Sequence, residues 1–422
     1  MIKLSKLYRS PEVYWDFLFL LFFQKQTIDI RMLNELFNQK FKDYFGDYPT
    51  LLVRAPGRIN LIGEHTDYNN GFVLPAAIDK AIYFAISSRN DRKCILYAYD
   101  LDDSYEFSLD NIQKSEKGWA NFLIGVLAEI LEKGKQIKNG FNVVFGGDVP
   151  LGAGLSSSAA VESGIGFALN QLYKLELSKL ELAIIAQQAE HKYAGVNCGI
   201  MDMFASIHGK TNSVIKLDCQ NLSFEYFPFN FPNYTLILCN TGVKHNLGDS
   251  EYNQRRAECE EGIRILRFAF PQVDSLRDVT IPMLRSQADK LPSIVFQRCK
   301  YVVEEIERVD VACKALENND LKSFGQKMYE THEGLSQDYE VSCPELDFLV
   351  EQSRNFEAVV GARMMGGGFG GCTINLVEAD AADDFIKNIR LAYHKTFNIY
   401  LQSYIVNISN GVQEIEKEVV LD

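Results

Sequence analysis

The chain has 422 residues, of which 47% are hydrophobic, so it can bury a substantial core and has room for two or three domains. Its 43 basic and 56 acidic side chains leave a formal net charge of −13, which repels polyanions and argues against nonspecific binding to nucleic acid. The nine cysteines have no regular spacing and the six histidines form no zinc-binding pattern, so we expect free thiols in a reducing cytoplasm and no tightly bound transition metal.

The first 31 residues differ from the rest of the chain. The strongly apolar run YWDFLFLLFF at 14–23 follows three basic residues, as in a secretory leader. Asp16 interrupts this run, however, no small-residue cleavage site follows it, and it is too short to cross a bilayer. We therefore interpret residues 1–31 as a non-native or disordered upstream extension, with the natural start at Met32, and we expect no association with a membrane.

Helix-like and strand-like patterns alternate after Met32. The first half is predicted to contain a helix at 35–45, a strand–turn–strand unit at 51–64, strands at 81–88 and 94–101, a helix at 119–131, a strand at 141–150 and a helix at 156–173. The second half is predicted to contain a strand at 235–243, a helix at 251–268, two or three helices between 281 and 357, a strand at 372–379, a helix through about 394 and a strand at 400–408. This mixture predicts an α+β fold, which we divide into domains of 32–220 and 221–422.

A loop rich in glycine and serine, PLGAGLSSSAA, precedes the helix at 156–173. Gly152 and Gly154 let the backbone approach a ligand closely, and the serines at 156–158 stand at the helix start, where main-chain N–H groups favour an anion. Serines also cap ordinary helices, so the loop alone fits either a phosphate site or a capped helix. Because it lacks the lysine of a Walker loop, main-chain amides and Mg²⁺ would have to hold the phosphates.

Two further segments place charged side chains near glycines. APGRINLIGEHTDYNNG carries Arg58, which suits a phosphate, and carboxylates that suit sugar hydroxyls; the alternative is a solvated turn with an ion pair. QQAEHKYAGVNCGIMDMFASIHGK places Glu190 in a helix and Asp202 in an apolar stretch, as either a helix cap or a working carboxylate. A third segment, GARMMGGGFGGCTINLV, has five glycines in six positions and fits either a close backbone contact or a flexible hairpin.

Together these segments resemble the galactokinases of the GHMP small-molecule kinase family, from about residue 35 to the C-terminus. The matching motifs are PLGAGLSSSAA, GGGFGGC, GRINLIGEHTDYN, CGIMD and NTGVKHNLGDSEYNQRR. The resemblance implies the two-domain GHMP kinase fold, with mixed sheets and helices and the active site in the cleft between the domains. It also implies transfer of the γ-phosphoryl group of ATP to the anomeric C1 hydroxyl of α-D-galactose, with Mg²⁺, in galactose metabolism.

The resemblance also implies roles for individual residues. Arg58 and Asp202 correspond to the catalytic pair; we expect Asp202 to orient the sugar hydroxyl and accept its proton late, and Arg58 to stabilise charge on the phosphoryl group. The sugar contacts would be Glu64, His65, Asp67, Gly199, Asp202 and Tyr252. The nucleotide contacts would be Trp119 near adenine and, around the phosphates, Gly152, Ala153, Gly154, Leu155, Ser156, Ser157 and Ser158. Ser158 and Glu190 would bind Mg²⁺.

Two departures from the family pattern leave the sugar selectivity open. Met203 stands where most galactokinases have glutamine, and Met365 stands where most have threonine. A kinase of the same family acting on another sugar, such as N-acetylgalactosamine or arabinose, is one alternative, and a catalytically inactive sugar sensor is another. The intact SSSAA run, Arg58 and Asp202 favour an enzyme. We expect a cytoplasmic monomer whose partners are the small molecules galactose and ATP.

Overall fold

The computed structural model describes residues 30–150, 154–244 and 248–415, which form three sheets and eleven helices. The strands are β1 (Leu51–Asn60), β2 (Phe72–Val73), β3 (Pro75–Ser88), β4 (Lys93–Ala98), β5 (Asp103–Ser108), β6 (Phe141–Gly147), β7 (Ser213–Asp218), β8 (Phe224–Pro228), β9 (Tyr234–Lys244), β10 (Val359–Met365), β11 (Gly370–Glu378), β12 (Gln402–Val406) and β13 (Gln413–Glu414). The helices are α2 (Ile30–Phe45), α3 (Gly118–Glu132), α4 (Ser157–Tyr173), α5 (Lys179–Ala189), α6 (Met201–His208), α7 (Gly248–Ala269), α8 (Ile281–Ser286), α9 (Ser293–Glu317), α10 (Leu321–Glu333), α11 (Pro344–Arg354) and α12 (Ala382–Phe397).

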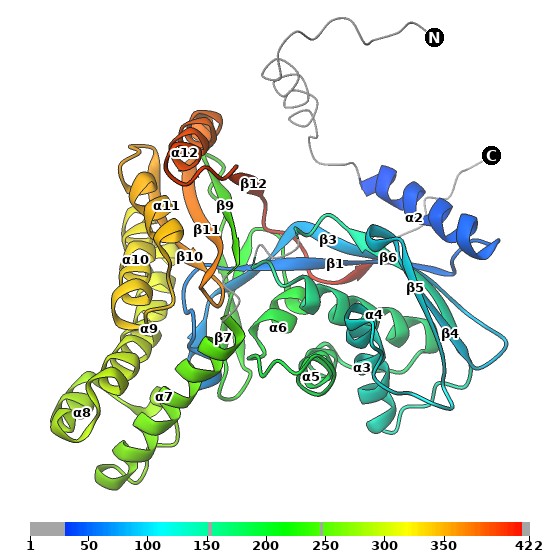
Figure 1. Ribbon diagram of the computed structural model, residues 1–422, viewed down its shortest axis with the longest axis horizontal. Coiled ribbons are helices and arrows are strands. Elements are labelled where there is room, and N and C mark those ends of the chain that lie inside the picture. The colour runs from blue at the N-terminus through cyan, green and yellow to red at the C-terminus, as the bar shows by residue number, and fades with distance from the viewer. Residues whose placement is uncertain (1–29, 151–153, 245–247, 416–422) are drawn as a thin grey trace, which may run out of the picture.

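The largest sheet, with strand order β13-β1-β3-β6-β4-β5, has helices on both faces (Figure 1). Helices α4 and α6 pack on one face and α2 packs on the other. Neighbouring residues of β1 accordingly belong to different cores: Val53 packs in the core of the α4 side, whereas Leu52 packs with Phe37 of α2. Because successive side chains of a strand point to opposite faces, a strand covered on both sides is buried throughout, as β1 is.

The second sheet, with strand order β10-β11-β9-β12, supports the helices of the C-terminal half. Ile237 of β9 packs with Leu349 of α11 and Phe385 of α12 in one core. Helices α9, α10 and α11 stand beside this sheet in Figure 1, away from the largest sheet. The small third sheet, β2-β7-β8, packs against α9 through β2 and β8.

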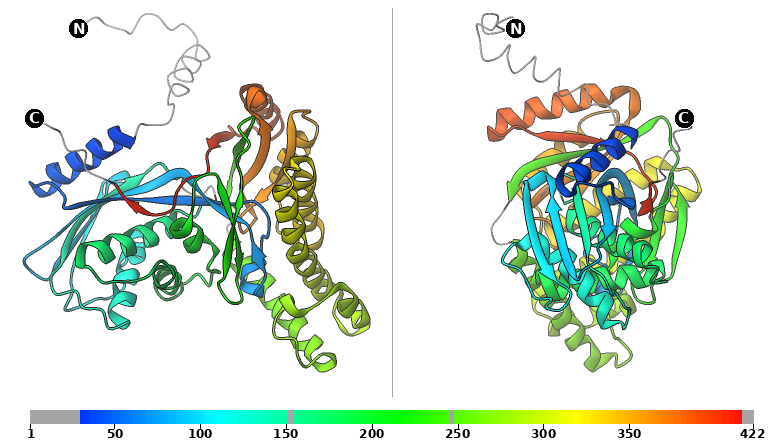
Figure 2. Two further views of the ribbon diagram at one scale, coloured as in Figure 1. Left: turned by 180° about the vertical axis from the view of Figure 1, so that it is seen from behind. Right: turned by 90° about the vertical axis from the view of Figure 1, so that its right-hand side faces the viewer.

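The end of the chain returns to the largest sheet. Strand β13 pairs antiparallel with β1, with Glu414 opposite Val53, and Figure 2 (left) shows this red strand beside the blue β1. The predicted C-terminal domain, 221–422, therefore contributes a strand to the main sheet of the predicted N-terminal domain.

Most predicted elements are present within a few residues, but two regions differ. The strand–turn–strand unit predicted at 51–64 is a single strand, β1, with a bulge between Pro56 and Arg58. Pro56 and Gly57 resemble a turn signal, but β1 pairs with β3 on both sides of the bulge, and Gly57 packs so closely that a Cβ there would lie 2.9 Å from the Leu155 carbonyl oxygen. The segment 281–357 holds four helices, α8 to α11, instead of two or three.

The N-terminal prediction falls almost wholly outside the described residues, which begin at 30, where α2 starts. Within the described part of the chain, no helix is both long enough and apolar enough to cross a bilayer.

Candidate active site

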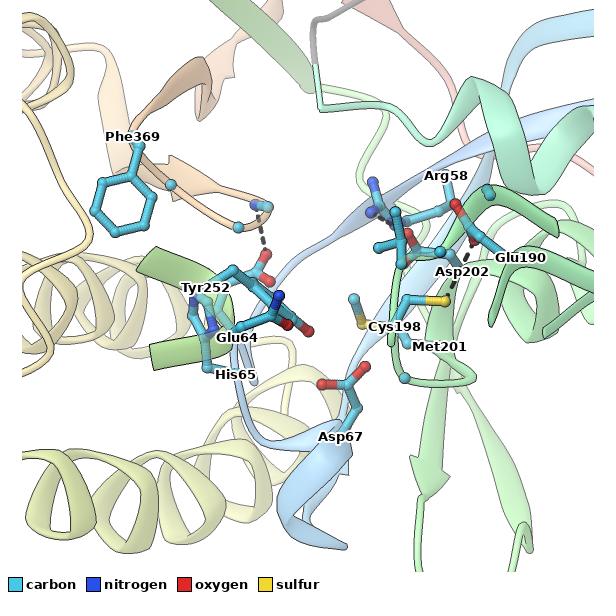
Figure 3. Close-up of a pocket in the computed structure, with 18 residues that line it drawn as sticks. Arg58, Glu64, His65, Asp67, Glu190, Cys198, Met201, Asp202, Tyr252 and Phe369 are labelled. Carbon is cyan, nitrogen blue, oxygen red and sulfur yellow. Dashed lines mark hydrogen bonds and ion pairs between the residues drawn. The ribbon is translucent and has the colours of Figure 1, made fainter. Parts of the chain in front are cut away.

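A cavity of about 360 Å³ is lined by segments that lie far apart in the sequence (Figure 3). Eight residues with predicted roles line it: Arg58, Glu64, His65, Asp67, Glu190, Gly199, Asp202 and Tyr252. The turn between β10 and β11, from Gly366 to Phe369, forms another part of its wall. The polar side chains that the sequence places in separate motifs therefore meet in one cavity.

Arg58 and Asp202 form a two-bonded ion pair at this cavity. Arg58 Nε lies 2.6 Å from Asp202 Oδ1, and Nη2 lies 2.6 Å from Oδ2. The Arg58 side chain is 6% exposed and that of Asp202 is 22% exposed, so the carboxylate retains an open side. Asp202 lies in the first turn of α6, but its two oxygens bond to Arg58 and not to the helix terminus, so its contacts are not those of a cap.

The loop before α4 contributes directly to this pair. Ser156 adopts a left-handed conformation with φ of 52° and makes no cap hydrogen bond to the helix. Its hydroxyl donates instead to Asp202 Oδ2, while Arg58 Nη1 donates to the Gly154 carbonyl and the Arg58 main-chain N–H donates to the Leu155 carbonyl at 3.2 Å. The glycine–serine loop and the Arg58–Asp202 pair are thus one connected unit.

The segment after β1 carries three of the predicted sugar contacts. Glu64 is 3% exposed, and its Oε1 accepts from Arg363 Nη2 and from the Gly366 main-chain N–H, both at 3.0 Å. His65 adopts φ of 61°, a conformation uncommon outside glycine and frequent at functional sites, and its Nδ1 lies 2.7 Å from the Tyr68 hydroxyl. Burial lowers the pKa of His65 to about 4, which keeps the imidazole neutral at physiological pH.

Asp67 is set apart from an ordinary surface carboxylate by its surroundings. Burial first, and then the charge of Asp202, raise the pKa of Asp67 to about 7. Gly199 packs directly against it, since a Cβ at Gly199 would fall 1.7 Å from Asp67 Oδ2. Tyr252 of α7 completes this side, with its ring centroid 5.5 Å from that of His65.

Two side-chain oxygens, from Ser158 and Glu190, lie together where α4 begins. Ser158 Oγ donates to Glu190 Oε1 at 2.9 Å, and the Cys198 thiol donates to Glu190 Oε2 at 3.3 Å. Glu190 is 8% exposed, and burial raises its pKa. One turn further along α4, Glu162 is fully buried, and neither of its carboxylate oxygens has a hydrogen-bond partner among the described residues.

The remaining predicted nucleotide contacts have different outcomes. Gly152 and Ala153 lie outside the described residues, while Ser157 begins α4. Trp119, on α3, does not line the cavity: its Nε1 donates to Asp103 Oδ2 at 2.9 Å and its ring lies 5.7 Å from that of Phe145.

Comparison with known proteins shows the family of the chain. A family model described as the galactokinase galactose-binding signature matches residues 39–88, and the N-terminal and C-terminal GHMP kinase models match 121–210 and 312–395. A galactokinase of Clostridium acetobutylicum is 40% identical over 390 residues, which covers 92% of this chain and 99% of the relative. One from Clostridium perfringens is 42% identical over 379 residues, covering 89% of this chain and 98% of the relative. The chain belongs to the galactokinase family.

Comparison with solved structures shows that this galactokinase-family chain also has the fold of its relatives. The Lactococcus lactis galactokinase, solved in complex with galactose, superimposes with a TM-score of 0.87 at 35% identity and covers 91% of this chain and 100% of that one. A mevalonate kinase with 19% identity and a TM-score of 0.59, which covers 86% of this chain, shares the fold alone. The predicted GHMP kinase fold and family are confirmed, and ATP is the phosphoryl donor of kinases in this family.

Several cavity features were not predicted. Cys198 and Met201 line the cavity; they lie in the CGIMD motif, but no role is predicted for either side chain. The glycine run after Met365, part of the GGGFGGC motif, also lines it, and no ligand contact is predicted for it. Arg363, which bonds to Glu64, lies in the segment GARMMGGGFGGCTINLV, but nothing in the sequence indicates that contact. The two departures from the family pattern, Met203 and Met365, are buried and do not line the cavity.

Proposed function

We propose that this protein transfers the γ-phosphoryl group of ATP to the anomeric C1 hydroxyl of α-D-galactose, giving galactose 1-phosphate and ADP. The observation that carries the proposal is the position of Asp202. Its carboxylate lines the same cavity as Glu64, His65 and Asp67, and it accepts a hydrogen bond from Ser156 of the glycine–serine loop, the proposed phosphate site. One carboxylate therefore lies where a sugar hydroxyl and a terminal phosphate would meet.

The proposed role of Asp202 is to orient the C1 hydroxyl and to accept its proton late in the reaction. An aspartate is too weak a base to remove a sugar hydroxyl proton in the ground state, and a loose phosphoryl-transfer transition state needs little prior activation of the nucleophile. Arg58, whose guanidinium is bonded to Asp202, would stabilise negative charge on the phosphoryl group as it moves.

The proposed sugar contacts are Glu64, His65, Asp67, Gly199, Asp202 and Tyr252. Carboxylates accept hydrogen bonds from several hydroxyls at once, which suits a hexose. Neutral His65 supports the assignment because its Nε2 is buried at the cavity and has no hydrogen-bond partner among the described residues. The close packing of Gly199 on Asp67 would set the position of that carboxylate.

The proposed phosphate contacts are the loop from Gly152 to Ser158 and the start of α4, whose main-chain N–H groups favour an anion. Trp119 is kept as a proposed neighbour of the adenine. The division of the chain near residue 220, with this loop in the first domain, is part of the same proposal, as are a monomeric state and a cytoplasmic location.

Ser158 and Glu190 would bind Mg²⁺. The described residues contain no cluster of three or more histidine, cysteine or acidic side chains arranged for a metal. Mg²⁺ nevertheless fits here, because it needs only one or two hard protein oxygens when phosphates and waters complete its shell, and Ser158 Oγ and Glu190 Oε1 lie 2.9 Å apart. When held by Ser158 and Glu190, the ion would supply positive charge that neutralises the phosphates.

A coupled assay for ADP release tests the proposal. Purified protein with Mg²⁺, ATP and galactose should release ADP and form a sugar 1-phosphate visible by ³¹P NMR. A panel with N-acetylgalactosamine and arabinose compares kcat/KM values, because a site built to bond one hydroxyl rejects sugars that misplace it. Absence of galactose phosphorylation, with the protein folded, would refute the proposed function.

A further inference from the structure

A buried cation, Arg363, lies behind the cavity wall. It belongs to β10 and its side chain is fully buried. Nε donates to the Leu61 carbonyl at 2.7 Å, Nη1 donates to the Met364 carbonyl at 2.6 Å, and Nη2 donates to the Asn60 carbonyl and, at 3.0 Å, to Glu64 Oε1. A guanidinium with all three nitrogens engaged is held in one orientation.

These bonds connect segments about 300 residues apart in the chain. Asn60, Leu61 and Glu64 belong to the end of β1 and the segment that follows it, whereas Arg363 belongs to the second sheet. The same segment is held at a second point, because the Gly63 N–H donates to the buried carboxylate of Glu305 on α9 at 2.7 Å. The proposed sugar contacts thus depend on side chains of the C-terminal half.

The bonds also distinguish the two oxygens of Glu64. Oε1 accepts from both Arg363 and the Gly366 N–H, whereas Oε2 has no donor among the described residues. Glu64 lines the cavity, so Oε2 is the oxygen left available to a ligand hydroxyl. Since removing one partner of a buried charge pair leaves the other uncompensated, the loss of Arg363 would disturb Glu64 directly.

We propose that Arg363 is a positioning residue for galactose. It holds Glu64 so that Oε1 accepts hydrogen bonds from the protein and Oε2 faces the sugar. Through the same contact it couples the Glu64 carboxylate to the Gly366 turn of the cavity wall. This inference rests on the proposed function for its kinetic consequence. Lysine cannot replace the arginine here, because a single ammonium nitrogen cannot reach acceptors that are spread around a planar fork.

The first experiment measures initial rates of Arg363→Lys with galactose and ATP varied separately. The KM for galactose should rise about tenfold or more, as expected for a weakened bond to a charged group, while the KM for ATP stays within about twofold. Arg54→Lys is the matched control, because Arg54 is also a buried arginine (5% exposed) that donates to main-chain carbonyls, but outside the cavity. It should leave both KM values unchanged.

A double-mutant comparison separates positioning from general damage. In a Glu64→Gln background, Arg363→Lys should add little to the rise in galactose KM, because both substitutions disturb the same contact. Full additivity, or an equal rise in the KM values of both substrates, would overturn the proposal. If the wild type is active and either of these outcomes is found, only the role of Arg363 is refuted. If the wild type is inactive, the proposed function itself is refuted.

A second measurement needs neither activity nor a folded Arg363 variant. Amide hydrogen exchange in Glu64→Ala should be about tenfold faster at Gly366 than in the wild type, because that N–H loses its buried charged acceptor. Asp67→Ala, a carboxylate of the same segment that does not bond to Gly366, is the control and should leave this amide protected. Unchanged exchange at Gly366 in Glu64→Ala would disprove the coupling between Glu64 and the cavity wall.

Discussion

Arg58 and Asp202 are joined by two parallel bonds of 2.6 Å, from Nε to Oδ1 and from Nη2 to Oδ2. Such a fork fixes both the position and the tilt of the carboxylate, which a single bond would not do. Arg58 comes from β1 and Asp202 from the first turn of α6, so the largest sheet and the helix layer on it determine the orientation of the proposed base.

Asp202→Asn should lower kcat by about 10²–10⁴-fold, because an amide cannot accept the hydroxyl proton as the phosphoryl group arrives. ATP binding, measured by calorimetry with a non-hydrolysable analogue, should persist. The melting temperature should fall, since Arg58 keeps its buried charge without a counter-ion.

The control for this variant is Asp218→Asn. Asp218 is a comparably buried aspartate paired with Arg277 at 3.4 Å, and it does not line the cavity. Its substitution should leave kcat close to that of the wild type. Unchanged turnover in Asp202→Asn would remove Asp202 from the mechanism.

Ser158→Ala should weaken the use of Mg²⁺ and ATP more than the binding of galactose. The substitution removes one proposed metal ligand and one of the two hydrogen bonds to Glu190, so we expect the half-saturating Mg²⁺ concentration and the KM for ATP to rise about tenfold. Ser163→Ala on the same helix is the control, because the buried Ser163 hydroxyl has no hydrogen-bond partner among the described residues. Equal effects of Ser158→Ala on both substrates would contradict its assignment to the metal.

Asp67→Asn should stabilise the protein at high pH while impairing galactose binding. In the folded state burial raises the pKa of Asp67 to about 7, whereas an aspartate in an unfolded chain titrates at about 4. The folded protein therefore binds the proton more tightly, and the stability that this proton contributes is present below about pH 4 and is lost as the pH rises towards 7.

Melting temperatures of the wild type and Asp67→Asn, recorded from pH 4 to pH 8, check this sign. The variant should melt higher than the wild type at pH 8, and the difference should shrink towards pH 4. A variant that is less stable than the wild type at pH 8 would show that ionised Asp67 is not destabilising. A site that costs stability in the free protein is consistent with a carboxylate held ready for a ligand.

The sequence indicated which polar residues lie at the cavity better than it indicated the contacts between them. Strand β6, the glycine–serine loop and α4 occur where the hydrophobic pattern and the turn residues indicate, because those signals are local. Eight of the residues assigned by motif line one cavity. Each motif is short and carries its own polar groups, but their meeting in one cavity is implied only by the family resemblance.

What could not be predicted depends on contacts between distant segments. Pro56 and Gly57 indicate a turn locally, but pairing with β3 and close packing on Leu155 keep β1 continuous. Ser156 resembles a helix cap in the sequence, whereas its hydroxyl turns to Asp202 because α6 places a carboxylate there. The contact of Arg363 with Glu64 joins residues 299 positions apart, and no periodicity or motif in a single sequence encodes such a pairing.

Gly199→Ala should raise the KM for galactose without a comparable change in the KM for ATP. A Cβ at this position would lie 1.7 Å from Asp67 Oδ2 and 2.3 Å from Cγ, so the carboxylate must move away from its place in the cavity. Gly118→Ala is the control, because a Cβ at Gly118 meets nothing within 4 Å. If displacing Asp67 removes a hydrogen bond to a sugar hydroxyl, the galactose KM should rise about tenfold in Gly199→Ala and stay unchanged in Gly118→Ala.

The melting curve of Gly199→Ala at pH 8 gives an independent readout, since a shift of Asp67 into solvent would reduce the destabilisation caused by its charge. An unchanged galactose KM, with the alanine accommodated, would mean that the position of Asp67 does not govern sugar binding.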